Sequence, residues 1–256
     1  MKYLNDVSKD CVGKICKSKL SGDFKILKYN HSKNVEIQFT NTGFETVARL
    51  DHIRNGVVKD PYVPSVHGIG VTGTKYQSTS NGVETKEYML WQNMLKRCYS
   101  DKYQKKYPTY ECCGVSDNFK SYEYFYEWCN EQVGFGNKGF DLDKDLLVKG
   151  NKAYSEDSCV FIPQEINKIL VKREASRGEY LIGVYWNKKA SAFVAKVKKN
   201  KGKQEWLGSF KTEVEAFNAY KQAKEAFIKE QANKFKSQID PRAYNALMNY
   251  TVEITD

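Results

Sequence analysis

The arrangement of hydrophobic and polar positions changes several times along the chain, and each change marks an expected element. β-forming residues alternate or cluster in Phe24–Asn30 and Asn34–Phe39, which predicts two strands joined by a turn. Thr42–Ile53 follows through a glycine turn. We therefore expect residues 1–60 to form a small β-rich unit of three or four antiparallel strands. Residues 61–86, rich in Pro, Gly, Ser and Thr, are expected to be a linker or an extended loop.

Residues 87–172 show helical periodicity first and short apolar runs afterwards. Aromatic and apolar residues recur at helical spacing in Glu87–Tyr103 and again in Asn118–Gly134, so two helices with buried stripes are expected. Two short strands separated by a glycine loop come next. The second strand, Cys159–Ile162, leads into a helix that Pro163 opens.

The last third of the chain has the pattern of a small layered domain, over residues 178–236. Three strand-like runs occupy Glu179–Asn187, Ser191–Asn200 and Lys203–Phe210. Thr212 then caps a long amphipathic helix. Three strands and one helix are enough to bury a shared core, so this region is expected to be a three-stranded antiparallel sheet packed on one helix.

The remaining tail, residues 237–256, is expected to add a short helix or turn and a last strand. The fold class predicted for the whole chain is therefore α+β and multi-domain. It would comprise a β-rich N-terminal unit, a middle domain of helices and short strands, and the C-terminal sheet and helix.

Strand alternation predicts which face of the C-terminal sheet is covered. Phe193, Ala195 and Val197 would share the face under the helix, while Val194, Lys196 and Lys198 would lie on the other face. Trp206 is expected to point mostly into the core.

The distribution of charge along the chain indicates a class of binding partner. The net charge is +10, and residues 171–236 hold 16 Lys and Arg against seven acids, so the rest of the chain is close to neutral. A basic domain of this kind is typical of proteins that bind nucleic acid, although a solvated lysine face without a partner would have the same composition.

Cysteine content and hydropathy indicate the cellular compartment in which the protein is expected. The seven cysteines are an odd number without Cys-x-x-Cys spacing, which favours free thiols, and Cys112, Cys113 and Cys129 are the only cluster that could hold a metal. No apolar run is long enough for a membrane helix, and the start of the chain is too polar for a signal peptide. We expect a soluble, cytoplasmic protein with no membrane partner.

Ordered motifs in the basic domain resemble a known DNA-binding family. The motifs are GVYW (Gly183–Trp186), FVAKV (Phe193–Val197), WLGSF (Trp206–Phe210) and T-x-x-E-A-x-x-A-Y (Thr212–Tyr220). Over about 45 residues they resemble the ethylene-response-factor (Apetala-two) type of domain, which reads the major groove with a three-stranded sheet.

The resemblance implies which side chains contact double-stranded DNA. The family's contact positions fall on Tyr185, Asn187, Lys189, Lys196, Lys198, Gln204 and Trp206, and the neighbouring basic and aromatic residues add Trp186, Lys188 and Lys203. The plant members favour arginine at several of these positions. Lysine does not make the bidentate contact to guanine that arginine makes, so affinity is expected to exceed sequence specificity.

The middle domain resembles a second family. The order W-x-x-M-x-x-R-C-Y (Trp91–Tyr99), L-D-K-D (Leu142–Asp145), Y-S-x-x-x-C (Tyr154–Cys159) and Asn167 resembles bacteriophage proteins related to His-Asn-His homing endonucleases. Such enzymes place two strands and a helix around one divalent ion, the ββα-metal arrangement. If the chain is phage-encoded, its setting would be the cytoplasm of a bacterial host.

This second resemblance implies catalytic and metal positions. Asp143 would be a metal ligand with Asp145 as a second acid, Asn167 would be the ligand on the helix, and Mg²⁺ or Mn²⁺ would be the ion. Lys144 stands where the family has its histidine general base. Lowering the pKa of a lysine from about 10.4 to near 7 costs roughly 4–5 kcal/mol. Alternatively, Asp143 and Asp145 only tie strand ends together.

Three functions remain open at this point. The first is DNA binding by a descendant of a homing endonuclease, degenerate in cleavage. The second is a non-enzymatic DNA-binding regulator, anti-defence factor or accessory protein. The third is binding of RNA or the ribosome, since lysine-rich sheets with aromatic residues also suit RNA.

Overall fold

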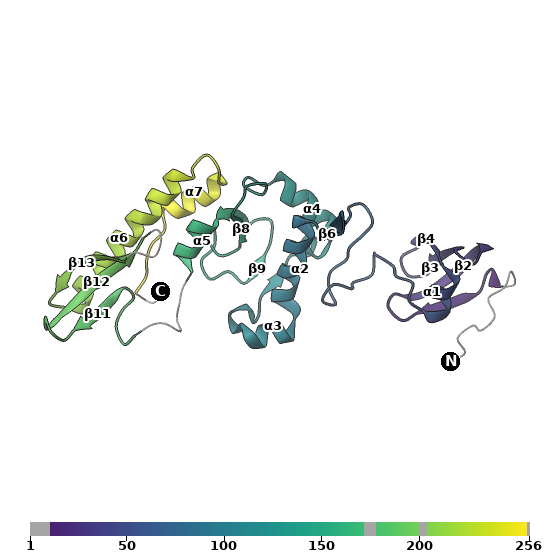
Figure 1. The fold of residues 1–256 in the computed structure, drawn as a ribbon, viewed down its shortest axis with the longest axis horizontal. Helices are drawn as coiled ribbons and strands as arrows, with labels where there is room; N and C mark the ends of the chain where they lie inside the picture. Colours follow the sequence, from purple (N-terminus) through teal and green to yellow (C-terminus); the bar gives the residue numbers. More distant parts are fainter. Residues whose placement is uncertain (1–10, 172–177, 200–203, 255–256) are drawn as a thin grey trace. The chain divides into compact units, whose positions relative to one another are not determined.

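The computed structural model describes residues 11–171, 178–199 and 204–254. It is a mixed α+β structure with several small sheets, one of them a three-stranded antiparallel sheet (Figure 1). The chain divides into two compact units, Met1–Glu127 and Trp128–Asp256. Among the described residues, no helix has both the length and the apolar character that crossing a bilayer requires.

Unit 1 begins with a four-stranded antiparallel sheet in the order β1-β2-β3-β4. These strands and the following helix are β1 Ile15–Ser18, β2 Gly22–His31, β3 Asn34–Phe39, β4 Glu45–Ala48 and α1 Leu50–Asn55. Fully buried Phe24, Ile26, Ile37 and Phe39 form the centre of its core. The expected three or four antiparallel strands are found as four; β1 is not among the predicted segments, and Thr42–Ile53 divides into β4 and the start of α1.

The second part of unit 1 is helical. Its elements are β5 Thr79–Ser80, β6 Val83–Glu84, α2 Lys86–Tyr99, α3 Asp101–Lys106, η2 Pro108–Tyr110, β7 Gly114–Val115, η3 Asn118–Lys120 and α4 Tyr122–Glu131, whose last residues belong to unit 2. The first expected helix is interrupted at Ser100, because its hydroxyl accepts the Tyr103 N–H and so starts α3 as a separate helix.

The aromatic stripes of these helices form a core, as their spacing predicts. Trp91, Phe119, Tyr122 and Phe125 are fully buried, and Trp91 Nε1 donates to the Phe119 carbonyl at 2.8 Å. The preceding loop packs on this core, since a Cβ on Gly70 would lie only 2.5–2.8 Å from Leu95 and Trp91.

Unit 2 begins with a strand–strand–helix succession. Its elements are β8 Phe140–Asp143, β9 Ala153–Tyr154, β10 Val160–Pro163 and α5 Gln164–Leu170. β8 and β10 are antiparallel, with Asp143 opposite Val160. Pro163 ends β10 and occupies the N-cap position of α5, because it supplies the φ angle that a helix start needs and no N–H that would require a partner.

The C-terminal sheet has the order β11-β12-β13 and is antiparallel throughout. Its strands and the two last helices are β11 Val184–Asn187, β12 Ala192–Lys198, β13 Gln204–Phe210, α6 Glu213–Lys234 and α7 Pro241–Met248. Ala195 and Val197 pack against Phe217 and Tyr220 of α6. Gly183, the residue before β11, has φ 79° and lies so close to the Tyr220 ring that a Cβ would be 2.1 Å from it.

The start of α6 confirms the expected cap. The Thr212 hydroxyl accepts the Glu215 N–H, and the Glu215 carboxylate accepts the Thr212 N–H, which together form a capping box. α6 is 22 residues long. Its first half covers the sheet, and its second half packs against α5 and α7.

The expected last strand is wrong, because Thr251–Ile254 form no strand. Val252 instead enters the core between sheet and helix with 3% of its surface exposed. Its carbonyl accepts from Lys221 Nζ at 2.8 Å, and its N–H donates to Glu225 Oε1 at 2.9 Å. The backbone groups that a strand would have paired are thus satisfied by side chains of α6.

Candidate nucleic-acid interface

One face of the C-terminal sheet is covered by α6, and the other face is uncovered. Residues directly opposite each other in an antiparallel pair share a face, and Lys196 pairs with Trp206 while Lys198 pairs with Gln204. The alternation along β12 adds Tyr185, which lies opposite Val194. We call the surface formed by Tyr185, Lys196, Lys198, Gln204 and Trp206 the open face.

Trp206 is the residue that sequence reasoning placed wrongly. It is 62% exposed, not core-facing. The register of β13 shifts by one residue, since Ala195 is opposite Gly208 but Lys196 is opposite Trp206, so Leu207 is an extra, bulged residue. Phe210 and Leu207 pack inward, and the shift turns Trp206 outward. Gly208, with φ 146°, allows this conformation.

Positive charge and aromatic rings lie together on the open face. Lys196 Nζ is 4.8 Å from the centroid of the Tyr185 ring, in the geometry of a cation–π contact. Lys198 is exposed at the end of β12, and Tyr185 is 38% exposed. Val194, which alternation also places on this side, is buried. Such a face offers cations for phosphates beside rings for sugars or bases.

The other predicted contact residues lie around this face or outside it. Trp186 is on the helix side of the sheet, where its ring meets Phe193 edge-on at 4.8 Å. The carbonyl of the Asn187 side chain accepts the N–H groups of Lys189 and Ala190, and so it shapes the hairpin turn. Lys188 and Lys189 are exposed on that turn. Lys203 lies outside the described residues.

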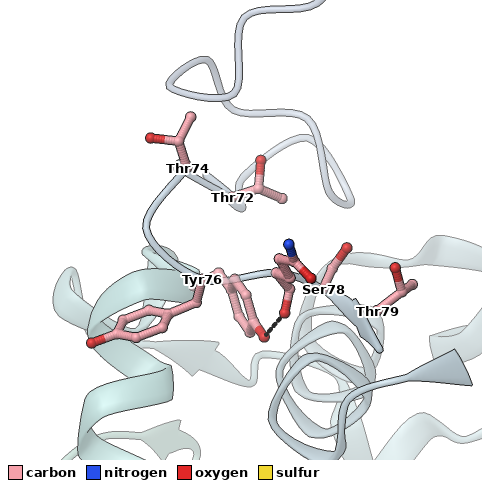
Figure 2. Close-up of a pocket in the computed structure, with 8 residues that line it drawn as sticks. Thr72, Thr74, Tyr76, Ser78 and Thr79 are labelled. Carbon is pink, nitrogen blue, oxygen red and sulfur yellow. Dashed lines mark hydrogen bonds between the residues drawn. The ribbon is translucent and has the colours of Figure 1, made fainter. Parts of the chain in front are cut away.

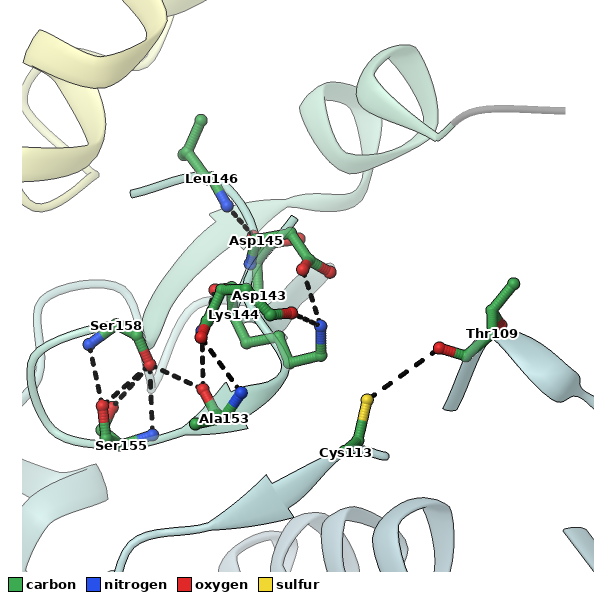
Figure 3. A network of polar contacts seen from close by, with 10 residues as sticks. Thr109, Cys113, Asp143, Lys144, Asp145, Leu146, Ala153, Ser155 and Ser158 are labelled. Carbon is green, nitrogen blue, oxygen red and sulfur yellow. Dashed lines mark hydrogen bonds and ion pairs between the residues drawn. The ribbon is translucent and has the colours of Figure 1, made fainter. Parts of the chain in front are cut away.

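At the Asp143–Asp145 turn, in contrast to the open face, the polar side chains bond to groups of the turn itself. Asp143 Oδ1 accepts the N–H groups of Asp145 at 2.9 Å and Leu146 at 2.7 Å, which caps the chain as it leaves β8 (Figure 3). Burial raises the pKa of Asp143, although these two N–H groups act in the opposite direction.

Lys144 is buried, with 7% of its surface exposed. Its Nζ donates to Asp145 Oδ1 at 2.6 Å and to the Asn151 carbonyl at 2.5 Å. The Asn151 side chain returns a bond from its Nδ2 to the Lys144 carbonyl at 2.8 Å. The Lys144 Nζ is therefore already bonded to two oxygen acceptors within the turn, and a general base needs a nitrogen that is free to accept a proton from water.

At the implied metal site, one oxygen of each carboxylate is already hydrogen-bonded within the turn. One oxygen of Asp143 accepts two backbone N–H groups, and Asp145 accepts the Lys144 ammonium, so both carboxylates are engaged. In the described part of the chain no three His, Cys, Asp or Glu side chains gather closely enough to hold a metal. Asn167 lies in the middle of α5, half-buried, on the helix that packs against β8.

Unit 1 contains a hydroxyl-rich pocket of about 560 Å³ that sequence reasoning did not predict (Figure 2). It is lined by residues of the 72–79 loop and by Tyr122, whose hydroxyl donates to the Gln77 carbonyl at 3.1 Å. Glu123 accepts the N–H groups of Thr74 and Lys75, and Tyr76 stacks on Tyr126 at 3.9 Å. These contacts fix the loop on α4, and no lining side chain is charged.

Comparison with known proteins finds no family model, no curated protein and no solved structure that matches this chain.

Proposed function

We propose that this chain binds double-stranded DNA through the open face of the β11–β12–β13 sheet. The observation that carries the proposal is the exposure of Trp206 beside Lys196, Lys198 and Tyr185 on a face that α6 leaves uncovered. An exposed aromatic ring beside two lysines that form no ion pair within the described residues offers contact to sugars or bases together with charge for phosphates.

The proposal includes the two kinships that the sequence motifs imply. The sheet packed on α6 would be an Apetala-two-type domain, and β8, β10 and α5 would be the remnant of a ββα-metal nuclease of the His-Asn-His type. What supports the first is the three-stranded sheet with its capped helix. What supports the second is the antiparallel strand pair that leads directly into a helix.

A direct test compares two double variants of the whole chain on a duplex of about 20 base pairs. Lys196→Gln/Lys198→Gln removes two charges from the open face. Lys229→Gln/Lys236→Gln removes two exposed charges from the second half of α6 and the residues after it. We expect the first to weaken binding at least about tenfold and to lower the salt slope by almost two, since each lost phosphate contact changes it by about 0.9.

The matched pair Lys229→Gln/Lys236→Gln should bind nearly as the wild type does. Equal binding by both double variants would remove the open face from the proposal. Tighter binding to an RNA hairpin than to duplex DNA would redirect the proposal to RNA, because the same side chains suit either polymer.

DNA cleavage is a second candidate, favoured by the position of Asp143 at the end of β8. Because the two acceptors of the turn already engage Lys144 Nζ, we expect the wild type to nick supercoiled plasmid poorly or not at all in Mg²⁺ or Mn²⁺. Lys144→His would restore a group that titrates near neutral pH. Metal-dependent nicking by Lys144→His that Asp143→Ala abolishes would support kinship with an active nuclease, whereas wild-type nicking that survives Asp143→Ala would contradict the assignment.

A further inference from the structure

Unit 1 has its own concentration of cations, at the corner where α2, α3 and η2 follow one another. Residues 96–111 contain five basic and two acidic side chains, although the chain outside residues 171–236 is close to neutral overall. We call this surface the tyrosine–lysine corner. Its members are Lys96, Arg97, Lys102, Lys105, Lys106, Tyr103, Tyr107 and Tyr110.

The backbone of the corner is held in one geometry by Gln104. Its Nε2 lies within donor distance of three carbonyl oxygens, those of Cys98 at 2.6 Å, Arg97 at 3.3 Å and Tyr110 at 3.3 Å. One half-buried amide thus links the end of α2, α3 and η2. The cations on these elements are therefore carried on a fixed frame and not on a loose loop.

The tyrosine rings form a tilted cluster with a cation beside each ring. The Tyr103 ring lies 4.7 Å from Tyr107 and 5.7 Å from Tyr110. Lys96 Nζ is 5.7 Å from the centroid of Tyr103. Arg97 and Lys106 stand at 5.6 Å and 5.3 Å over Tyr110 and Tyr107. Each of the three rings thus holds one cation near it.

The lysines of the corner lack acidic partners within the described part of the chain. Lys96, Lys102, Lys105 and Lys106 are all exposed, and none lies at ion-pair distance from a carboxylate there. Elsewhere in unit 1, by contrast, Lys75 pairs with Glu127 and Lys120 pairs with Asp117. Unpaired cations on a rigid frame repel one another, and a polyanion relieves that repulsion.

We propose that the tyrosine–lysine corner is a second DNA-binding surface, which takes the phosphate backbone of a duplex without reading its bases. The ligand is a phosphate chain because lysine ammonium groups act as point charges and four exposed lysines gather here. Duplex DNA carries one charge per about 1.7 Å of its axis, so it meets a cluster of cations in any register. This inference rests on the proposed DNA binding of the open face, which brings the duplex to the chain.

The test uses the whole chain with two triple variants. Lys102→Gln/Lys105→Gln/Lys106→Gln neutralises the corner. Lys17→Gln/Lys25→Gln/Lys33→Gln neutralises three exposed lysines of the N-terminal sheet, so both variants have the same net charge. Affinity for a duplex of about 40 base pairs is measured between about 50 and 200 mM salt. The corner triple should lower the salt slope by about 2–3 and weaken binding at least about tenfold, and the control triple should change the slope by less than one.

Hydrogen exchange supplies a second readout, because bound DNA should slow exchange of the amides in residues 96–110 of the wild type. Equal slopes for the two triples, or no protection of these amides, would overturn the inference. The open-face double variant in the same series separates the two claims. If it loses affinity and the corner triple does not, the proposed function stands and the corner fails. If only the corner triple loses affinity, the open face is the part that fails.

Discussion

The open face and the Asp143–Asp145 turn carry the same kinds of side chain and use them in opposite ways. On the open face, Lys196 and Lys198 stand beside exposed aromatic rings. At the turn, Lys144 is buried and its Nζ donates hydrogen bonds to Asp145 and to the Asn151 carbonyl. The comparison teaches that net charge does not locate a polyanion site. For the proposed DNA-binding face, the useful distinction is whether a lysine already forms an ion pair with a carboxylate, as Lys144 does with Asp145.

The largest expected effect on stability comes from removing Lys144 from the Asp143–Asp145 turn. Lys144→Ala should lower the free energy of unfolding of unit 2 by about 2–3 kcal/mol, because it leaves the Asn151 carbonyl and Asp145 without their buried donor. Calorimetry of the whole chain measures this. Lys196→Ala is the matched change on the open face and should alter stability by less than about 1 kcal/mol. A stability loss in Lys196→Ala but not in Lys144→Ala would reverse the comparison.

Lys224 of α6 is half-buried, between the buried Lys144 and the exposed Lys198. Burial lowers the pKa of Lys224 to about 8. Because the unfolded chain binds that proton more tightly, Lys224 should make stability rise as pH increases from about 8 to about 10.5. Lys224→Met should stabilise the chain at neutral pH by on the order of 1–3 kcal/mol, and the gain should shrink above pH 8. The control is Lys229→Met, at an exposed position.

Trp206 tests which face of the sheet is open. A buried tryptophan would cost roughly 3–5 kcal/mol on replacement by alanine, but the exposed ring should cost less than about 1 kcal/mol. Trp206→Ala should instead weaken duplex binding about tenfold. Phe217→Ala, which removes a ring from the core under the sheet, should show the opposite pattern in the same melting and binding measurements.

The smallest effect concerns Asp143. Since its pKa is raised in the folded state, its contribution to stability is fully present below the ordinary aspartate pKa of about 3.9 and is lost as pH rises through the folded value. Asp143→Asn keeps an oxygen for the two N–H groups, so it should stabilise the chain at neutral pH by less than about 1 kcal/mol and have no effect at low pH. Melting curves with and without Mg²⁺ would also detect a metal held by Asp143, since only the wild type would then be stabilised.

Features with local causes could be predicted from the sequence. The hydroxyl of Thr212 and the carboxylate of Glu215 lie three residues apart and form their capping box without help from the rest of the fold. The aromatic stripe with Trp91 and Leu95 is likewise set by helical spacing, and so is the succession of β10, Pro163 and α5.

Features that depend on distant partners could not be predicted. A one-residue bulge at Leu207 decides the side of Trp206, and two-residue periodicity has no means of detecting it. Thr251–Ile254 have strand-like composition, but Lys221 and Glu225 of α6 compete for the backbone of Val252. Lys144 is polar by sequence, and only the fold shows that its ammonium is buried.

The 22-residue helix α6 joins the two contrasted regions, since the sheet covers its first half and the Phe235 ring, just past its end, lies 6.4 Å from Phe140 of β8. A helix of this length is a rod of about 33 Å, close to one turn of duplex DNA at about 3.4 Å per base pair. The helix therefore fixes both the distance between the sheet and β8 and their relative rotation about the helix axis. One inserted residue would rotate its far end by about 100°, whereas four would nearly restore the original direction.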